Sequence, residues 1–140
     1  MKKSLLIIAV ILLAYTSESF GQIGFAVAKD DDHSSLRWQL IWNTKNPDQK
    51  ARKKLKDLGY ENVYTLPGGK ECGHNLTSGY WVVIEADHKL YNGEWKTSFG
   101  AGASSTSYSE AEARAVENLR IYDWSWERED GYTISKKGTF

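Results

Sequence analysis

The chain has 140 residues, with 18 basic and 18 acidic side chains and a formal net charge of zero. A balanced charge predicts no general attraction to nucleic acid or to an anionic membrane surface. The single cysteine, Cys72, excludes an intramolecular disulfide, so the fold has to be stabilised by packing.

Residues 1–21 have the pattern of a secretory signal peptide. Lys2 and Lys3 precede an apolar run from Leu5 to Ala14, which is shorter than the roughly 20 residues that a membrane-spanning helix needs. Small residues stand at the two positions that a signal peptidase reads, so we expect cleavage before Gln22. The short basic start favours a bacterial signal and a periplasmic or secreted protein. The alternative, an uncleaved membrane anchor, is disfavoured because the run ends early.

Cleavage leaves 119 residues, 22–140. Loss of Lys2, Lys3 and Glu18 leaves 16 basic and 17 acidic side chains. This length predicts one domain that buries about two-thirds of the surface of its unfolded chain. We expect no nucleic-acid partner and no stable membrane insertion after cleavage.

The first half of the mature chain predicts the order strand, strand, helix, strand. Bulky apolar residues alternate with small or polar ones over residues 23–28 and 37–43. This period of two is typical of strands with one bulky face. Asn46 can cap a helix that has Pro47 in its first turn and ends at Gly59. The third strand is expected over residues 63–66.

The same order recurs in the second half. Ser107 and Glu110 fit a capping box at the start of a second helix, which runs to Ile121. The strands of this half are expected over residues 79–85, 95–101 and 132–135.

We therefore predict an α+β fold with an internal duplication. Two ββαβ halves, about 22–67 and 78–135, are expected to form a mostly antiparallel sheet of six strands. Both helices are expected to pack on one face of that sheet, because each has a single apolar stripe. The alternative is coincidence, since ββα units are common.

Two segments carry a resemblance to a known class of protein. The strand start GYWVVI at residues 79–84 and the helix start SYSEAEA at residues 107–113 resemble small exported bacterial proteins with a duplicated domain of unknown function. That class has Gly/Ser-rich strands leading into Ala-rich helices and often carries paired cysteines, whereas this chain has one. The resemblance covers most of the mature chain and implies no activity.

Cys72 and His74 form the most suggestive spot for covalent chemistry. A thiolate is a strong nucleophile, and a nearby imidazole, from His74 or His88, can lower the pKa of the thiol and shuttle its proton. The spacing alone is a weak signal, and a half-buried free cysteine is the favoured interpretation. A cysteine-dependent hydrolase or transferase using Cys72 with His74 or His88 is the alternative function. A non-enzyme is favoured.

The sequence predicts no metal and no cofactor. Cys72, His74, His88 and Asp87 lack the paired spacing of structural zinc sites. The acidic run 30–32 lacks the alternating carboxylates of a calcium-binding loop. The five basic residues between positions 50 and 56 are interpreted as the solvent-exposed face of a helix rather than as a binding site for a polyanion.

Six tryptophans are many for a chain of this length. Three of them occupy alternate positions on the apolar faces of predicted strands and are expected in the core, namely Trp38, Trp42 and Trp95. Trp124 and Trp126 differ because they lie in a charged segment without clear apolar partners.

Rigid aromatic side chains flanked by charges are typical of protein interfaces and of sugar-stacking platforms. The alternative is that Trp124 and Trp126 cover an end of the core beneath the second helix. We predict an exported, non-catalytic binding module that contacts its ligand through Trp124, Trp126 and Arg128. The expected partner is a protein or a cell-envelope glycan, and an inhibitor or immunity-type protein is one concrete form.

Overall fold

The computed structural model describes residues 23–65 and 76–140. The expected signal peptide and the residues Cys72 and His74 lie outside the described residues. The first half contains β1 (Ile23–Lys29), β2 (Ser35–Trp42), α2 (Pro47–Asp57) and β3 (Val63–Thr65). The second half contains β4 (Tyr80–Lys89), β5 (Trp95–Ser104), α3 (Tyr108–Tyr122), the short 3₁₀ helix η2 (Arg128–Asp130) and β6 (Thr133–Thr139).

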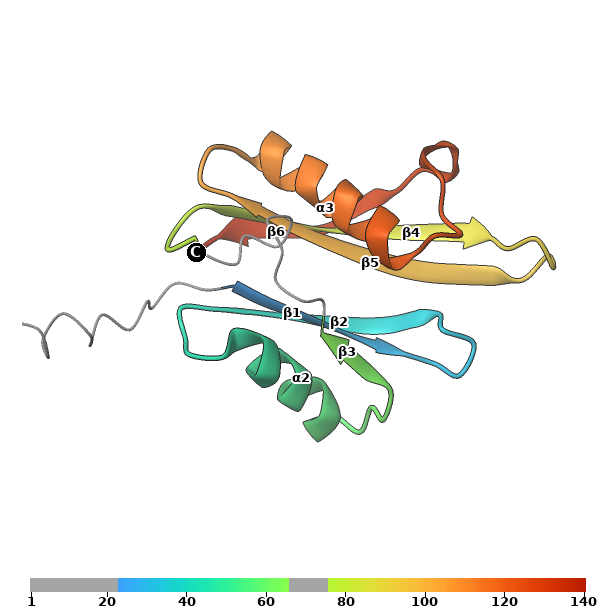
Figure 1. The fold of residues 1–140 in the computed structure, drawn as a ribbon, viewed down its shortest axis with the longest axis horizontal. Coiled ribbons are helices and arrows are strands. Elements are labelled where there is room, and N and C mark those ends of the chain that lie inside the picture. Colours follow the sequence, from blue (N-terminus) through green and yellow to red (C-terminus); the bar gives the residue numbers. More distant parts are fainter. Residues whose placement is uncertain (1–22, 66–75) are drawn as a thin grey trace, which may run out of the picture.

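The strands form two antiparallel three-stranded sheets, with the orders β2-β1-β3 and β5-β4-β6. The two sheets face each other, with α2 on the outer side of one and α3 on the outer side of the other (Figure 1). The α+β class is confirmed. The prediction of one six-stranded sheet with both helices on the same face is wrong.

The strand pattern explains why two sheets form. Every residue from 23 to 28 is buried, so β1 has two covered faces rather than one. Its bulky residues Ile23, Phe25 and Val27 pack between the sheets against residues of β4 and β5. Its small residues face α2, and Ala26 and Ala28 pack there with Leu55 of the helix.

Small residues also let α3 approach its sheet closely. A Cβ atom at Gly102 of β5 would collide with the backbone of α3 at Ala111 and Ala115. Gly100 has the same relation to the backbone of Ala115. The Gly/Ala-rich side of β5 is therefore the surface on which α3 lies.

The helix starts differ in how they are capped. Ser107 Oγ accepts a hydrogen bond from Glu110 N at 3.1 Å, as the capping box predicts. Glu110 does not complete the box, because its Oε2 accepts instead from Ser104 Oγ at 2.8 Å. Asn46 holds the N-cap position of α2 but makes no side-chain cap hydrogen bond there. No helix in residues 23–65 and 76–140 is long and apolar enough to cross a bilayer.

Candidate functional site

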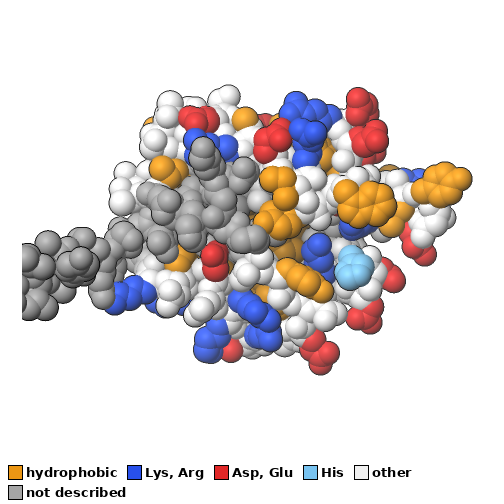
Figure 2. All heavy atoms as spheres, in the orientation of Figure 1, with side chains coloured by type: hydrophobic (Ala, Val, Ile, Leu, Met, Phe, Trp, Pro, Cys, Tyr) orange, Lys and Arg blue, Asp and Glu red, His pale blue; other side chains and the backbone are white. Residues whose placement is uncertain are grey.

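A groove of about 650 Å³ opens at one end of the molecule, where two hairpin tips meet the segment that follows α3. Figure 2 shows hydrophobic and Lys/Arg side chains gathered there around an exposed histidine. The groove is lined by Lys29, Asp32 and His33 from the first hairpin, Lys89, Leu90, Tyr91, Asn92 and Lys96 from the second, Tyr122 at the end of α3, and Trp124, Ser125 and Glu127 from the segment after it.

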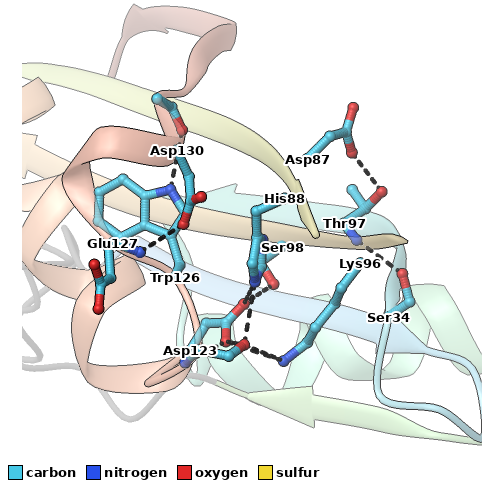
Figure 3. Close-up of polar contacts among 12 residues, drawn as sticks. Ser34, Asp87, His88, Lys96, Thr97, Ser98, Asp123, Trp126, Glu127 and Asp130 are labelled. Carbon is cyan, nitrogen blue, oxygen red and sulfur yellow. Dashed lines mark hydrogen bonds and ion pairs between the residues drawn. The ribbon is translucent and has the colours of Figure 1, made fainter. Parts of the chain in front are cut away.

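The first hairpin tip is fixed by its own acidic residue. Asp30 Oδ1 accepts hydrogen bonds from Asp32 N at 3.0 Å and from Ser34 N at 2.8 Å. Ser34 Oγ then accepts from Thr97 N of β5 at 2.9 Å, as Figure 3 shows. One serine side chain thus ties the two hairpins together beside the groove.

Asp123 holds two residues that line the groove, Lys96 and Ser125. Its carboxylate accepts hydrogen bonds from Lys96 Nζ at 3.0 Å, from Ser125 N at 3.1 Å, and from the hydroxyl groups of Ser98 and Ser125 (Figure 3). Burial of the carboxylate raises its pKa, but the hydrogen bonds from Ser125, Ser98 and Lys96 outweigh this effect and lower the pKa of Asp123 to about 2. The residue is therefore a buried anion with its charge fully engaged.

The chain turns sharply after α3. Asp123 N donates to Leu119 O at 2.8 Å and ends the helix, and Trp126 N donates back to Asp123 O at 3.2 Å. This turn directs Trp124 into solvent, where its side chain is 90% exposed. Trp124 lines the groove.

Trp126 is buried, which corrects its expected place on a binding surface. It is only 4% exposed and packs with Val82 and Ile84 beneath α3. Its Nε1 donates to Gly131 O at 2.9 Å, and its ring meets that of Tyr132 edge-on. Trp126 therefore anchors the segment to the core, whereas its neighbour Trp124 remains open.

Arg128 lies away from the groove. Its Nη2 forms an ion pair with Glu117 Oε1 of α3 at 3.1 Å. It lines a separate hollow of about 350 Å³ together with Tyr132 and residues of α3. The three predicted binding residues therefore do not converge, and only Trp124 faces the groove.

Trp95 is exposed, not buried as the strand phase predicts. Its side chain is 71% exposed at the start of β5. The β4–β5 hairpin extends beyond the end of the β1–β2 hairpin (Figure 1), so the opposite sheet does not cover its tip. Trp38 is half-buried and packs against the core. Trp42 is 38% exposed although its ring contacts that of Trp81, so the prediction that it lies in the core is wrong.

His88 is buried beside Asp123. It is 2% exposed, and its Nε2 lies 3.1 Å from Ser125 Oγ and 3.4 Å from Asp123 Oδ2. A catalytic triad needs the hydroxyl and the carboxylate on opposite nitrogens of the imidazole, whereas both lie on Nε2 here. His88 Nδ1 has no hydrogen-bond partner among the described residues. The arrangement is that of a structural cluster rather than an activated serine.

A smaller cavity of about 130 Å³ lies next to the groove and shares Lys29 and Tyr122 with it. Lys29 Nζ lies 5.6 Å from the centre of the Tyr64 ring. Burial lowers the pKa of Lys29, the nearby Lys96 lowers it further, and Asp123 partly opposes them. Lys29 is therefore a partly desolvated cation at the boundary of the two spaces.

Sequence reasoning missed Lys29, Lys96 and Asp123 as parts of one site. A signal was present for Lys29, because it follows Ile23, Phe25 and Val27 at the same spacing of two. The alternation therefore places a cation on a buried strand face. Within the described ranges no group of three or more histidine, aspartate or glutamate side chains is arranged to hold a metal ion.

No protein-family model matches the chain, and no curated protein or solved structure matches it.

Proposed function

We propose that the protein is an exported, non-catalytic binding module whose ligand is a protein or a cell-envelope glycan, with Trp124 as its main contact. The observation that carries this proposal is the position of Trp124, which is almost fully exposed yet follows the firmly held Asp123. A large aromatic side chain on a fixed backbone loses little conformational freedom when a ligand covers it.

The dimensions of the groove support a compact ligand segment. Small-ligand sites typically measure about 300–1,000 Å³, and the groove of about 650 Å³ falls inside that range. Either one or two sugar rings or a single inserted protein loop has this size. If the ligand is a protein loop, this protein acts as an inhibitor or immunity-type protein.

Export is part of the same proposal. Its support is the basic start, the short apolar run and the small residues before Gln22. Amino-terminal sequencing of protein isolated from the producing cells is expected to begin at Gln22. A sequence that begins at Met1 contradicts export by this route.

We also propose that the two halves arose by duplication, in line with the resemblance to exported bacterial proteins with a duplicated domain of unknown function. The support is the shared ββα order followed by a final strand, with the first strand central in both sheets. The segment around Trp124 and η2 is then an insertion of the second half that supplies one wall of the groove.

The test compares two exposed tryptophans. Trp124 lines the groove, whereas Trp95 is exposed but does not line it. The Trp124→Ala variant is expected to lose at least tenfold in retention on envelope material of the producing cells, and Trp95→Ala is expected to keep it. Protease treatment of the material distinguishes a protein ligand from a glycan. Equal retention of the two variants contradicts the proposal.

A further inference from the structure

We infer that the groove binds an acidic saccharide, whose carboxylate or phosphate pairs with Lys29 while a sugar ring stacks on Trp124. This inference rests on the proposed function and narrows it to one class of ligand. Three observations carry it: the lack of a direct ion pair at Lys29 among the described residues, the engaged state of the neighbouring acid, and the mixture of side chains around the groove.

Lys29 is a cation without a direct ion-pair partner in the described part of the chain, although the charge of Asp123 acts on it at longer range. Among the described residues no carboxylate lies within ion-pair distance of its Nζ. The end of β1 holds it half-buried, and the residue lines both the groove and the smaller cavity. A partly desolvated charge gains more from a counter-ion than a fully hydrated one does, because water screens it less.

Asp123 is the closest candidate for an internal counter-ion, but its charge is used elsewhere. Lys96 Nζ forms an ion pair with Asp123 Oδ1 at 3.0 Å, and both groups are largely buried. The serine hydrogen bonds occupy the other lone pairs of the same carboxylate. Lys29 is therefore left as the interior charge that a ligand can satisfy.

The acidic side chains that line the groove are exposed to solvent. Asp32 and Glu127 line it and are both exposed. Water and salt screen exposed charges over about 10 Å, so these acids oppose an entering anion weakly. Lys89 stands at the rim with them and adds a cation. The half-buried Lys29 therefore determines which charge the ligand carries at its inner end.

The remaining side chains favour a sugar over a peptide. Trp124 and Tyr91 both line the groove and are almost fully exposed, so the flat faces of their rings are accessible to a ligand. Such faces suit the C–H side of a sugar ring, an apolar surface with hydroxyl groups at its edge. His33 also lines the groove, and its ring nitrogens can form hydrogen bonds with those hydroxyls.

The experiment measures binding of defined probes by titration calorimetry. Trigalacturonate carries carboxylates, and its methyl ester is the same saccharide without the charge. Glucose 6-phosphate with glucose forms the corresponding phosphate pair, and a hexaglutamate peptide tests a protein source of carboxylates. Lys29→Met keeps an unbranched apolar side chain and removes the charge, whereas Lys136→Met removes a cation from β6, outside the groove.

At least one acidic sugar is expected to bind tenfold or more tightly than its uncharged counterpart. Lys29→Met is expected to abolish that difference, and Lys136→Met to leave it unchanged. The pair that shows the difference identifies carboxylate or phosphate. Equal affinity for charged and uncharged sugars, both lost in Trp124→Ala, overturns the inference but keeps the binding site. Binding of hexaglutamate alone, or of no probe at all, overturns the inference that the ligand is an acidic saccharide.

Discussion

Asp123 and Trp124 are adjacent in the chain, yet Asp123 is 2% exposed and Trp124 is 90% exposed. The turn after α3 separates them: the carboxylate accepts hydrogen bonds from lysine and serine donors, whereas the indole is exposed to solvent. The polar cluster thus holds the backbone from which the aromatic side chain projects. Stability and ligand binding are expected to depend on different members of this pair.

The charge of Asp123 predicts how stability depends on pH. Its pKa is lowered from 3.8 to about 2 in the folded protein, so its charge stabilises the fold at pH values above the unfolded pKa. That contribution, about 2 kcal/mol, is lost as the pH falls from about 4 to 2. Urea unfolding of the protein and of Asp123→Asn at pH 7, 4 and 2 measures it. The stability difference between the two is expected to shrink toward pH 2, and a constant difference contradicts the prediction.

Trp126→Ala is expected to destabilise the fold strongly. The substitution empties a buried site beneath α3 and removes the hydrogen bond to Gly131 O. Loss of a large buried aromatic side chain typically costs about 3–5 kcal/mol. Trp124→Ala is the matched control, expected to change the free energy of unfolding by less than about 0.5 kcal/mol. Chemical denaturation of both variants gives the comparison, and similar losses refute the assignment of one buried and one exposed ring.

Gly102→Ala is expected to push α3 away from β5. The added methyl group meets the helix backbone at Ala111 and Ala115, and backbone atoms cannot rotate aside as a side chain can. We expect a loss of about 1–3 kcal/mol, as overpacking of a filled interior produces. Ser105→Ala, at an exposed position just after the strand, serves as control. Unchanged thermal stability of Gly102→Ala shows that the contact is looser than described.

Ser34→Ala is expected to loosen the junction between the hairpin tips. The variant loses the acceptor for Thr97 N, a hydrogen bond that joins two segments 63 residues apart in sequence. A hydrogen bond of this kind contributes about 1 kcal/mol. Amide hydrogen exchange followed by NMR is expected to be faster at Thr97 and unchanged in the centre of β4. An unaltered exchange rate at Thr97 contradicts the prediction that Ser34 holds the two hairpin tips together.

The sequence predicted the elements better than their arrangement. Alternation in residues 23–28 located β1 correctly, because bulky and small residues follow each other strictly. The same alternation left the layering open, because a face of Gly24, Ala26 and Ala28 suits either solvent or a closely packed helix. That Gly24 approaches the backbone of Pro47 and Asp48 depends on tertiary contacts. The second sheet was therefore not predictable from β1 alone.

The candidate site was predicted in part, for a similar reason. The segment around Trp124 and Trp126 was located from its composition, but local sequence did not distinguish the buried ring from the exposed one. The difference depends on the turn at Asp123 and on the acceptor at Gly131. Lys29 and Lys96 join the site only when two hairpins from different halves meet. Such long-range proximity leaves little trace in a single sequence.

The most direct test of the binding site observes the tryptophan indole signals by NMR as glycan fragments from the producing cells' envelope are added. The signal of Trp124 is expected to shift with a saturating dependence on concentration, while the signals of Trp95 and the buried Trp126 stay in place. A shift at Trp95 without one at Trp124, or none at any indole with either glycan fragments or envelope proteins, contradicts the account.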